Sequence, residues 1–291
     1  MLVYTTPPSP EIFYPYIIIN ASNTDTWYYI KSEVKYLIID SGVFNIFHKA
    51  SRVEYPGGYK YWIGRVASLW YYASRYVRDA YATIPDYPSD YPHNPVPQNV
   101  EKTIRNIEYA LEKYPDIKWL IPIQGLPDSL SSVAKTISIL KERGLLKSDY
   151  VAIASTCVSR NTEFLKRLAL TAKTHLPDKR IHMFGVIKKA WDRLKHLIFS
   201  VDTVTHSFYC YGVYGIMCSN SREKAVGWVM FLTGLKKGGY IDDETFELSL
   251  ESAAKWSGLD RGELLELKGR GKRGKERGVN ASASGKNRLG S

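Results

Sequence analysis

Acidic residues stand at or near the ends of several apolar runs in this sequence. The clearest run, residues 35–44, reads KYLIIDSGVF and passes from apolar residues into Asp40, Ser41 and Gly42. A carboxylate at the end of a buried strand is costly unless it caps the next helix or faces a ligand. Asp86 ends a later run, and Asp202 lies within another. Three such acids could supply a nucleophile, a general acid or base, and an acceptor for the donors of a ligand.

Uncharged candidates stand at the ends of other runs. Gln124 with Gly125, Ala154 with Ser155, and Gly185 each occupy such a position. Because the carboxyl ends of parallel strands meet at one edge of a sheet, we expect these residues and the three acids to surround one site.

Short β-rich runs recur along the chain and predict the elements that position these residues. There are eight of them, at 2–6, 16–22, 36–41, 80–86, 118–125, 150–156, 180–186 and 197–204. Amphipathic segments such as NVEKTIRNIEYALEKY separate several of them, and this alternation predicts a parallel sheet with crossover helices. Eight strands favour a closed (β/α)8 barrel. A doubly wound sheet is the alternative, but its glycine-rich phosphate loop is missing.

The predicted domain organisation has three parts. Residues 1–220 form the barrel, with an insertion at about 43–79, residues 221–267 form C-terminal helices packed on or completing the barrel, and residues 268–291 form a basic tail.

The insertion after the third strand is rich in aromatic and basic residues. Seven Tyr or Trp residues between 59 and 76 are interleaved with Arg65, Arg75 and Arg78. We expect a helix over the barrel mouth whose aromatic side chains stack on bases and whose arginines contact phosphates. The alternative is that the aromatic side chains pack the helix onto the barrel while the arginines face water.

The net charge of +11 is concentrated near the end of the chain. Residues 268–291 hold eight Lys or Arg against the single acid Glu276, a net charge of +7. A segment of this composition predicts a disordered arm that attracts phosphates, with Lys272 and Arg273 among the contacts. A solubilising terminus is the alternative interpretation.

The cysteine pattern argues against a metal site and against a disulfide framework. Cys157, Cys210 and Cys218 are odd in number and show no C-x-x-C spacing, so we expect reduced cysteines, no metal and no cofactor. No window reaches the roughly 18 apolar residues of a membrane span, and the first residues do not form a signal peptide. The expected location is therefore the cytoplasm, with no membrane partner.

Taken in order, the strand ends resemble the tRNA-guanine transglycosylase superfamily, most closely the branch that places 7-deazaguanines in DNA. The motifs that carry the resemblance are IIDSGVF, IPDYPSD, IPIQG, YVAIAS, HMFGV and FSVDTVTH. They occur in the family's order between residues 38 and 206.

The resemblance implies a role for each candidate. Asp40, in the D-S-G motif, would be the general acid/base, and Asp202 would be the nucleophile that forms a covalent glycosyl-enzyme. Asp86 and Gln124 would recognise a guanine-type base, with Asp90 as a second choice for the acid. Backbone groups at Gly125, Ala154, Ser155 and Gly185 would complete the base site.

The departures from the family favour the DNA branch. Val43, Phe44 and Asn45 replace the usual Phe-Gln after the D-S-G turn, and the three cysteines cannot form the family's zinc site. The implied function is replacement of guanine in DNA by a 7-deazaguanine such as the 7-cyano form. The alternatives are the same chemistry on tRNA, a non-catalytic nucleic-acid-binding barrel and an unrelated barrel hydrolase. The sequence leaves open whether accessory proteins take part and whether a cell or a virus is the source.

Overall fold

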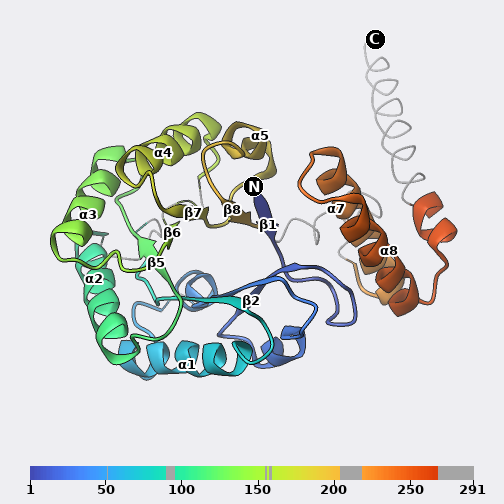
Figure 1. Cartoon of the computed structure of the whole chain (residues 1–291), viewed down its shortest axis with the longest axis horizontal. Coiled ribbons are helices and arrows are strands. Elements are labelled where there is room, and N and C mark those ends of the chain that lie inside the picture. Colours follow the sequence, from blue (N-terminus) through green and yellow to red (C-terminus); the bar gives the residue numbers. More distant parts are fainter. Residues whose placement is uncertain (51, 90–95, 155, 157–158, 204–217, 268–291) are drawn as a thin grey trace, which may run out of the picture. The chain divides into compact units, whose positions relative to one another are not determined.

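The barrel consists of eight parallel strands that follow one another around a ring (Figure 1). The computed structural model describes residues 1–50, 52–89, 96–154, 156, 159–203 and 218–267. The strands are β1 Leu2–Tyr4, β2 Tyr16–Asn20, β3 Tyr36–Asp40, β4 Asp79–Thr83, β5 Trp119–Ile123, β6 Tyr150–Ile153, β7 Arg180–Met183 and β8 Ser200–Asp202. Strand β1 pairs with β8, and a bridge between Thr5 and Ile17 brings β1 beside β2. The (β/α)8 barrel predicted from the sequence is confirmed.

Helices cover the outside of the ring of strands (Figure 1). They are α1 Gly58–Ala73, α2 Val96–Lys113, α3 Leu130–Glu142, α4 Thr162–His175 and the short α5 Trp191–Leu194. Between β2 and β3 the chain forms only the 3-10 helix Thr24–Tyr29, and a π-helix at Phe44–Lys49 precedes α1. The side chains of Ser129 and Asn161 cap α3 and α4 by accepting bonds from backbone N–H groups of the first turn.

The barrel interior is built by every second residue of each strand, because side chains alternate between the two faces of a sheet. One cluster of buried interior residues contains Tyr4, Ile38, Leu120, Tyr150 and Phe184. The interior is therefore a packed core, and a site can form only above it, at the carboxyl ends of the strands.

Helix α1 confirms the aromatic helix expected after the third strand but not its position over the barrel mouth. The indole N–H of Trp62 donates to the carbonyl of Ser41, 2.7 Å away, and that of Trp70 donates to the carbonyl of Ala80 at 2.8 Å. Ser41 follows the carboxyl end of β3 and Ala80 lies near the amino end of β4, so α1 runs along the height of the barrel wall. Its buried aromatic side chains pack the helix onto the strands.

A second compact unit contains Pro7–Tyr14 and the helices α7 Ser221–Lys237 and α8 Asp243–Ser257. Residues 7–14, which the prediction included in the barrel segment 1–220, group with these helices. The hydroxyl of Ser252 accepts the Phe13 N–H at 2.9 Å and that of Ser249 donates to the Phe13 carbonyl at 2.8 Å. These bonds attach the early segment to α8.

Two further findings concern the cysteines and membranes. Cys218 is part of a disulfide, so the expectation of three reduced cysteines is wrong for this residue. Cys157 and Cys210 lie outside the described residues. Within the described part of the chain, no helix has the length and apolar character of a membrane span.

Candidate functional site

Four polar side chains continue the inward-facing series of the strands beyond the packed core. Asn20 is two residues beyond Ile18 in β2, Asp40 is two beyond Ile38 in β3, and Asp202 is two beyond Ser200 in β8. Gln124 continues the series of Leu120 just after β5. Because the alternation of the strands is regular, these residues face the axis at the carboxyl end of the barrel. These strand-end residues converge because each lies an even number of positions after an inward-facing residue of its strand.

Asp40 is half-buried and is held from two sides. Its Oδ2 accepts a bond from Nδ2 of Asn20 at 3.3 Å and from the backbone N–H of Gly42 at 3.2 Å. Gly42 has φ +84°, and a Cβ there would lie 2.6 Å from Oδ1 of Asn20, so only glycine fits this turn.

Burial raises the pKa of Asp40 to about 7, assisted by the negative charges of Asp202 and Asp86, although backbone N–H groups oppose the shift. Each cause acts on the charged form of the carboxyl group. Asp40 can therefore both give and take a proton near neutral pH.

Asp86 lies in the loop after β4 and is paired with Gln124. The Gln124 amide donates to Oδ2 of Asp86, and both side chains are buried, with exposed fractions of 0% and 3% respectively. A buried carboxylate and amide together offer acceptors and donors that could match the edge of a polar heterocycle.

Helix α2 holds the Asp86 loop through a buried polar face. Asn106 donates to the carbonyl of Pro85 at 2.7 Å, Asn99 donates to that of Pro88 at 2.7 Å, and the hydroxyl of Thr103 accepts the Tyr87 N–H at 2.9 Å. These α2 residues recur at helical spacing and lie on one face. The loop backbone is therefore fixed although it has no regular structure.

Tyr55 fixes the same loop from the opposite side. Its hydroxyl donates to the carbonyl of Asp86 at 2.6 Å, and its ring stacks on Trp62 at a centroid distance of 5.8 Å. Burial raises the pKa of Tyr55, and the nearby Asp86 carboxylate adds to this effect, so the hydroxyl remains a donor.

Asp202 is held through its Oδ1 atom. The backbone N–H of Gly185 donates to Oδ1 at 2.8 Å, and Nε2 of the fully buried His182 lies 3.3 Å from the same oxygen. Gly185 adopts φ +59°, a conformation that glycine tolerates best, and this turn directs its N–H at the carboxylate. Both of these contacts are made to Oδ1, and within the described part of the chain Oδ2 of Asp202 accepts no hydrogen bond.

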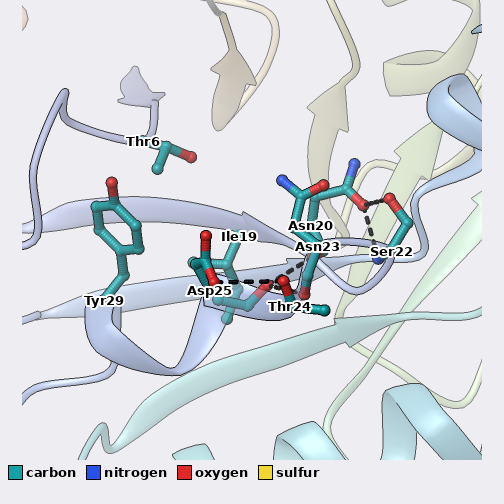
Figure 2. Close-up of a pocket in the computed structure, with 9 residues that line it drawn as sticks. Thr6, Ile19, Asn20, Ser22, Asn23, Thr24, Asp25 and Tyr29 are labelled. Carbon is teal, nitrogen blue, oxygen red and sulfur yellow. Dashed lines mark hydrogen bonds between the residues drawn. The ribbon is translucent and has the colours of Figure 1, made fainter.

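A polar pocket of about 470 Å³ lies at the end of β2 and is lined by residues of β2 and of the 3-10 helix that follows it (Figure 2). Asn20 belongs both to the pocket wall and to the contacts of Asp40. Hydroxyl, amide and carboxylate groups form much of the wall, contributed by Thr6, Asn20, Ser22, Asn23, Thr24, Asp25, Thr26 and Tyr29. Such groups suit a hydroxylated or phosphorylated ligand better than an apolar one.

The other predicted base-site residues have structural contacts. Gly125 lies against α3, where an added Cβ would come within 2.4 Å of Cγ2 of Val133, and the Ala154 N–H donates to the carbonyl of Ile123 at 3.1 Å. Ser155 and Asp90 lie outside the described residues.

Of the three predicted arginines of the insertion, only Arg65 lies near the carboxyl ends of the strands, beside Asn20 at the end of β2. Arg65 donates through Nε to the carbonyl of Ala21 at 2.7 Å. Arg75 and Arg78 are exposed and precede β4, so they lie toward the amino ends of the strands, away from Asp86. Lys272 and Arg273 lie outside the described residues.

Sequence reasoning did not identify several residues of the site. Asn20 could have been found because it ends a strand in the same way as Asp40, with which it is paired in register. Tyr55 and Asn106 carry no local signal, because their partners are about 20 to 30 residues away and become neighbours only in the folded barrel.

The described residues do not fit a zinc site. They contain no group of three or more His, Cys, Asp or Glu side chains arranged for a metal, and the sulfur of Cys218 is engaged in a disulfide. Comparison with models of protein families gives no match. Comparison with curated proteins gives none either.

Proposed function

We propose that this barrel exchanges a guanine-type base in DNA for a 7-deazaguanine through a covalent intermediate on Asp202. The supporting observation is the proximity of three carboxylates, of which Asp40 has a pKa of about 7 that the charges of Asp202 and Asp86 help to raise. A nucleophilic carboxylate and a second carboxyl group that moves protons are the two groups that such chemistry needs.

In the first half-reaction, Asp40 is the acid. A carboxylate oxygen of Asp202 attacks C1′ of the target nucleotide as the C1′–N9 bond breaks, and the bonding electron pair moves into the guanine ring. The neutral carboxyl group of Asp40 gives its proton to the departing base. Asp202 is then esterified to C1′, and Asp40 is a carboxylate.

In the second half-reaction, Asp40 is the base. It takes the N9 proton of the incoming 7-deazaguanine, whose N9 attacks C1′. The ester bond breaks, and its electron pair returns to Asp202. The proton on Asp40 is thereby restored, which is why a pKa near neutrality suits this residue.

Asp86 and Gln124 are proposed to recognise the base. A carboxylate accepts from the ring N–H and the exocyclic amine of guanine, and the Gln124 amide, which has two N–H groups, donates to its carbonyl. A base with another pattern would leave buried polar groups unpaired and would be rejected. The pocket beside Asn20 would take the sugar and phosphate of the extruded nucleotide.

Two features bear on the nucleic-acid substrate. The cysteines do not fit the zinc site that the resemblance to tRNA enzymes implies, which favours DNA, whereas the positive charge of residues 268–291 would attract the phosphates of DNA and tRNA alike. Neither feature concerns the chemistry, which would be the same on tRNA.

The exchange reaction provides the test. Radiolabelled guanine is incubated with duplex DNA or tRNA and with the wild type, Asp202→Ala, Asp40→Asn or the control Asp149→Asn, whose carboxylate pairs with Arg180 at the other end of the barrel. We expect incorporation into DNA with the wild type and the control, and a loss of at least about 10³-fold with either site variant. Incorporation into tRNA alone would reassign the substrate, and DNA binding without exchange in either nucleic acid would indicate a binding protein.

A further inference from the structure

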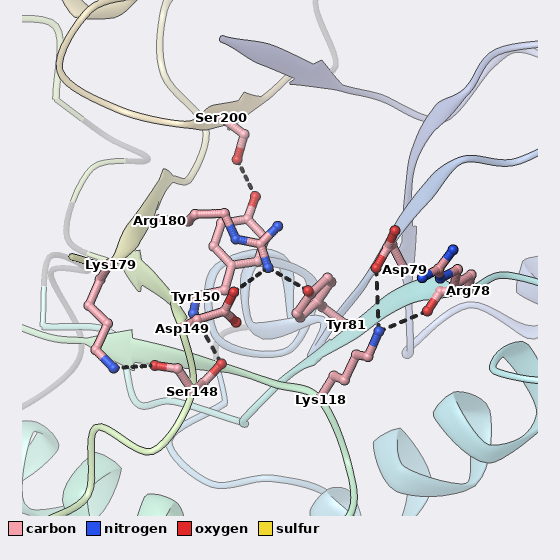
Figure 3. A network of polar contacts seen from close by, with 10 residues as sticks. All are labelled: Arg78, Asp79, Tyr81, Lys118, Ser148, Asp149, Tyr150, Lys179, Arg180 and Ser200. Carbon is pink, nitrogen blue, oxygen red and sulfur yellow. Dashed lines mark hydrogen bonds and ion pairs between the residues drawn. The ribbon is translucent and has the colours of Figure 1, made fainter.

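A chain of buried polar groups rises through the barrel core to Asp202. The hydroxyl of Tyr150 is bonded to that of Ser200 (Figure 3). The Oγ atom of Ser200 lies 2.7 Å from Nδ1 of His182. The other ring nitrogen, Nε2, lies 3.3 Å from Oδ1 of Asp202. All three side chains below Asp202 are fully buried.

The negative charge of Asp202, at the upper end of this chain of polar groups, determines which atom donates in each bond. If Nδ1 carried the proton, the lone pair of Nε2 would face a carboxylate oxygen, which is repulsive. The opposite order, in which Tyr150 donates to Ser200 and Ser200 donates to Nδ1, leaves the proton on Nε2 facing Asp202. Burial raises the pKa of Tyr150, which keeps its hydroxyl protonated as the first donor.

The Nε2 atom of His182 is the unusual member of the chain. It is buried and has no hydrogen-bond partner of good geometry among the described residues, although Oδ1 of Asp202 is close. An unpaired buried donor is costly, so a function for this group is expected.

We propose that His182 is a positioning residue that, with the Gly185 N–H, holds Oδ1 of Asp202 and leaves Oδ2 as the attacking oxygen. A carboxylate held through one oxygen has a fixed orientation, and the other oxygen then lies on the side of the substrate. When the ester forms through Oδ2, Oδ1 becomes the carbonyl oxygen of that ester and can still accept both bonds. This inference deepens the proposed function and rests on it for the role of Asp202.

The barrel core offers a matched pair of variants. Tyr81 and Tyr150 are both buried interior tyrosines, and their rings contact each other at a centroid distance of 5.1 Å. The Tyr81 hydroxyl is bonded to Arg180, whereas that of Tyr150 is bonded to Ser200 (Figure 3). Tyr150→Phe removes the hydroxyl that begins the chain of polar groups leading to Asp202. Tyr81→Phe also removes a buried tyrosine hydroxyl but leaves that chain intact.

The kinetic test uses six variants and base exchange as the readout. We expect His182→Phe to lower kcat about 10²-fold with KM nearly unchanged, and His182→Gln, whose Nε2 amide can still donate, to retain activity within about fivefold of wild type. Ser200→Ala and Tyr150→Phe should each lower kcat several-fold, and Tyr81→Phe should not. Full activity of a folded His182→Phe variant, when Asp202→Ala is inactive, would overturn the inference; an active Asp202→Ala variant would overturn the proposed function instead.

A second readout does not depend on activity. Two-bond 1H–15N correlation spectra of the wild type, assigned by the signals that His182→Gln removes, report which nitrogen of His182 carries the proton. The inference requires a neutral His182 ring that carries its single proton on Nε2. A neutral ring protonated on Nδ1 would overturn it whether or not exchange is observed.

Discussion

At the residue scale, the environment rather than the residue type distinguishes the acids. Asp40 and Asp202 are both carboxylates at inward-facing strand ends, yet the bonds that Asp40 accepts from Gly42 and Asn20 are long, at 3.2 and 3.3 Å, whereas Asp202 accepts one at 2.8 Å. Burial and neighbouring negative charges raise the pKa of Asp40 to about 7. Two carboxylates in different environments can thus divide the roles of proton carrier and nucleophile.

The raised pKa predicts that Asp40→Asn stabilises the protein in a pH-dependent way. The native state binds this proton more tightly than the unfolded chain, whose carboxyl has the ordinary value of 3.8. The stability of the wild type should therefore fall as the pH rises from about 4 to about 7. The variant does not lose stability in this way, because an asparagine side chain does not ionise. Thermal melts should show equal Tm values near pH 4 and a Tm about 2–6 °C higher for the variant at pH 8. A Tm difference that is the same at both pH values would contradict the assignment.

At the element scale, two of the strand-end loops are held by helices that pack outside the barrel. Helix α2 holds the loop of Asp86, and α3 lies so close to Gly125 that no side chain fits there. The site is therefore as rigid as the packing of these helices, and it should respond to changes far from the carboxylates.

Removing the amide of Asn106 should loosen the Asp86 loop. Asn106→Ala leaves the buried carbonyl of Pro85 without this donor, which should lower the free energy of unfolding by about 1–3 kcal/mol. The KM for the incoming base should rise because Asp86 moves. Denaturant titration and exchange kinetics measure both effects. The exposed Glu101→Ala on the same helix is the control and should change neither; if Asn106→Ala behaves like it, α2 does not position the loop.

The close approach of α3 can be tested by a double-mutant cycle. Gly125→Ala places a methyl group against Val133 and should cost about 1–3 kcal/mol of stability. Val133→Ala removes the opposing Cγ atoms, so Gly125→Ala should cost less in that background. Additive changes in the free energy of unfolding would mean that the glycine is needed for another reason.

Strand identity was predictable because it is a local property. Each apolar run expected to form a strand overlaps one, and the inward-facing positions of Asp40 and Asp202 follow from counting along β3 and β8. The position of α1 was not predictable, since its aromatic residues fit both a lid that stacks bases and a helix buried on the barrel wall. The hydrogen bonds of Trp62 and Trp70 to the backbone at Ser41 and Ala80 show that α1 packs on the barrel wall.

At the scale of the whole molecule, the chain combines a barrel with a second unit assembled from distant segments. Phe13 is bonded to Ser252, which is 239 residues away in the sequence, and no pattern within residues 7–14 indicates this partner. Much of the net positive charge belongs to residues 268–291, which follow the helices of both units in the sequence. Affinity for nucleic acid and chemistry at the strand ends should therefore be separable.

Truncation after residue 267 tests this separation. The shortened chain loses a net charge of +7, so its DNA affinity should fall about 10²-fold or more at low salt, and the slope of log K against log salt should become shallower by about 4. Fluorescence anisotropy at several salt concentrations measures both quantities. At saturating DNA the exchange rate should stay within about twofold of the full chain. An unchanged salt slope would show that the phosphate contacts lie elsewhere.

The most direct test of the account is the mass of a covalent adduct. The protein is mixed with a guanine-containing DNA duplex, denatured rapidly and analysed by intact mass spectrometry followed by peptide mapping. We predict an adduct with the mass of the protein plus one DNA strand less one guanine, attached to Asp202, formed by the wild type and absent from Asp202→Ala. An adduct that persists in Asp202→Ala, or base exchange that proceeds without any adduct under conditions that trap esters, would contradict the assignment of Asp202 as nucleophile.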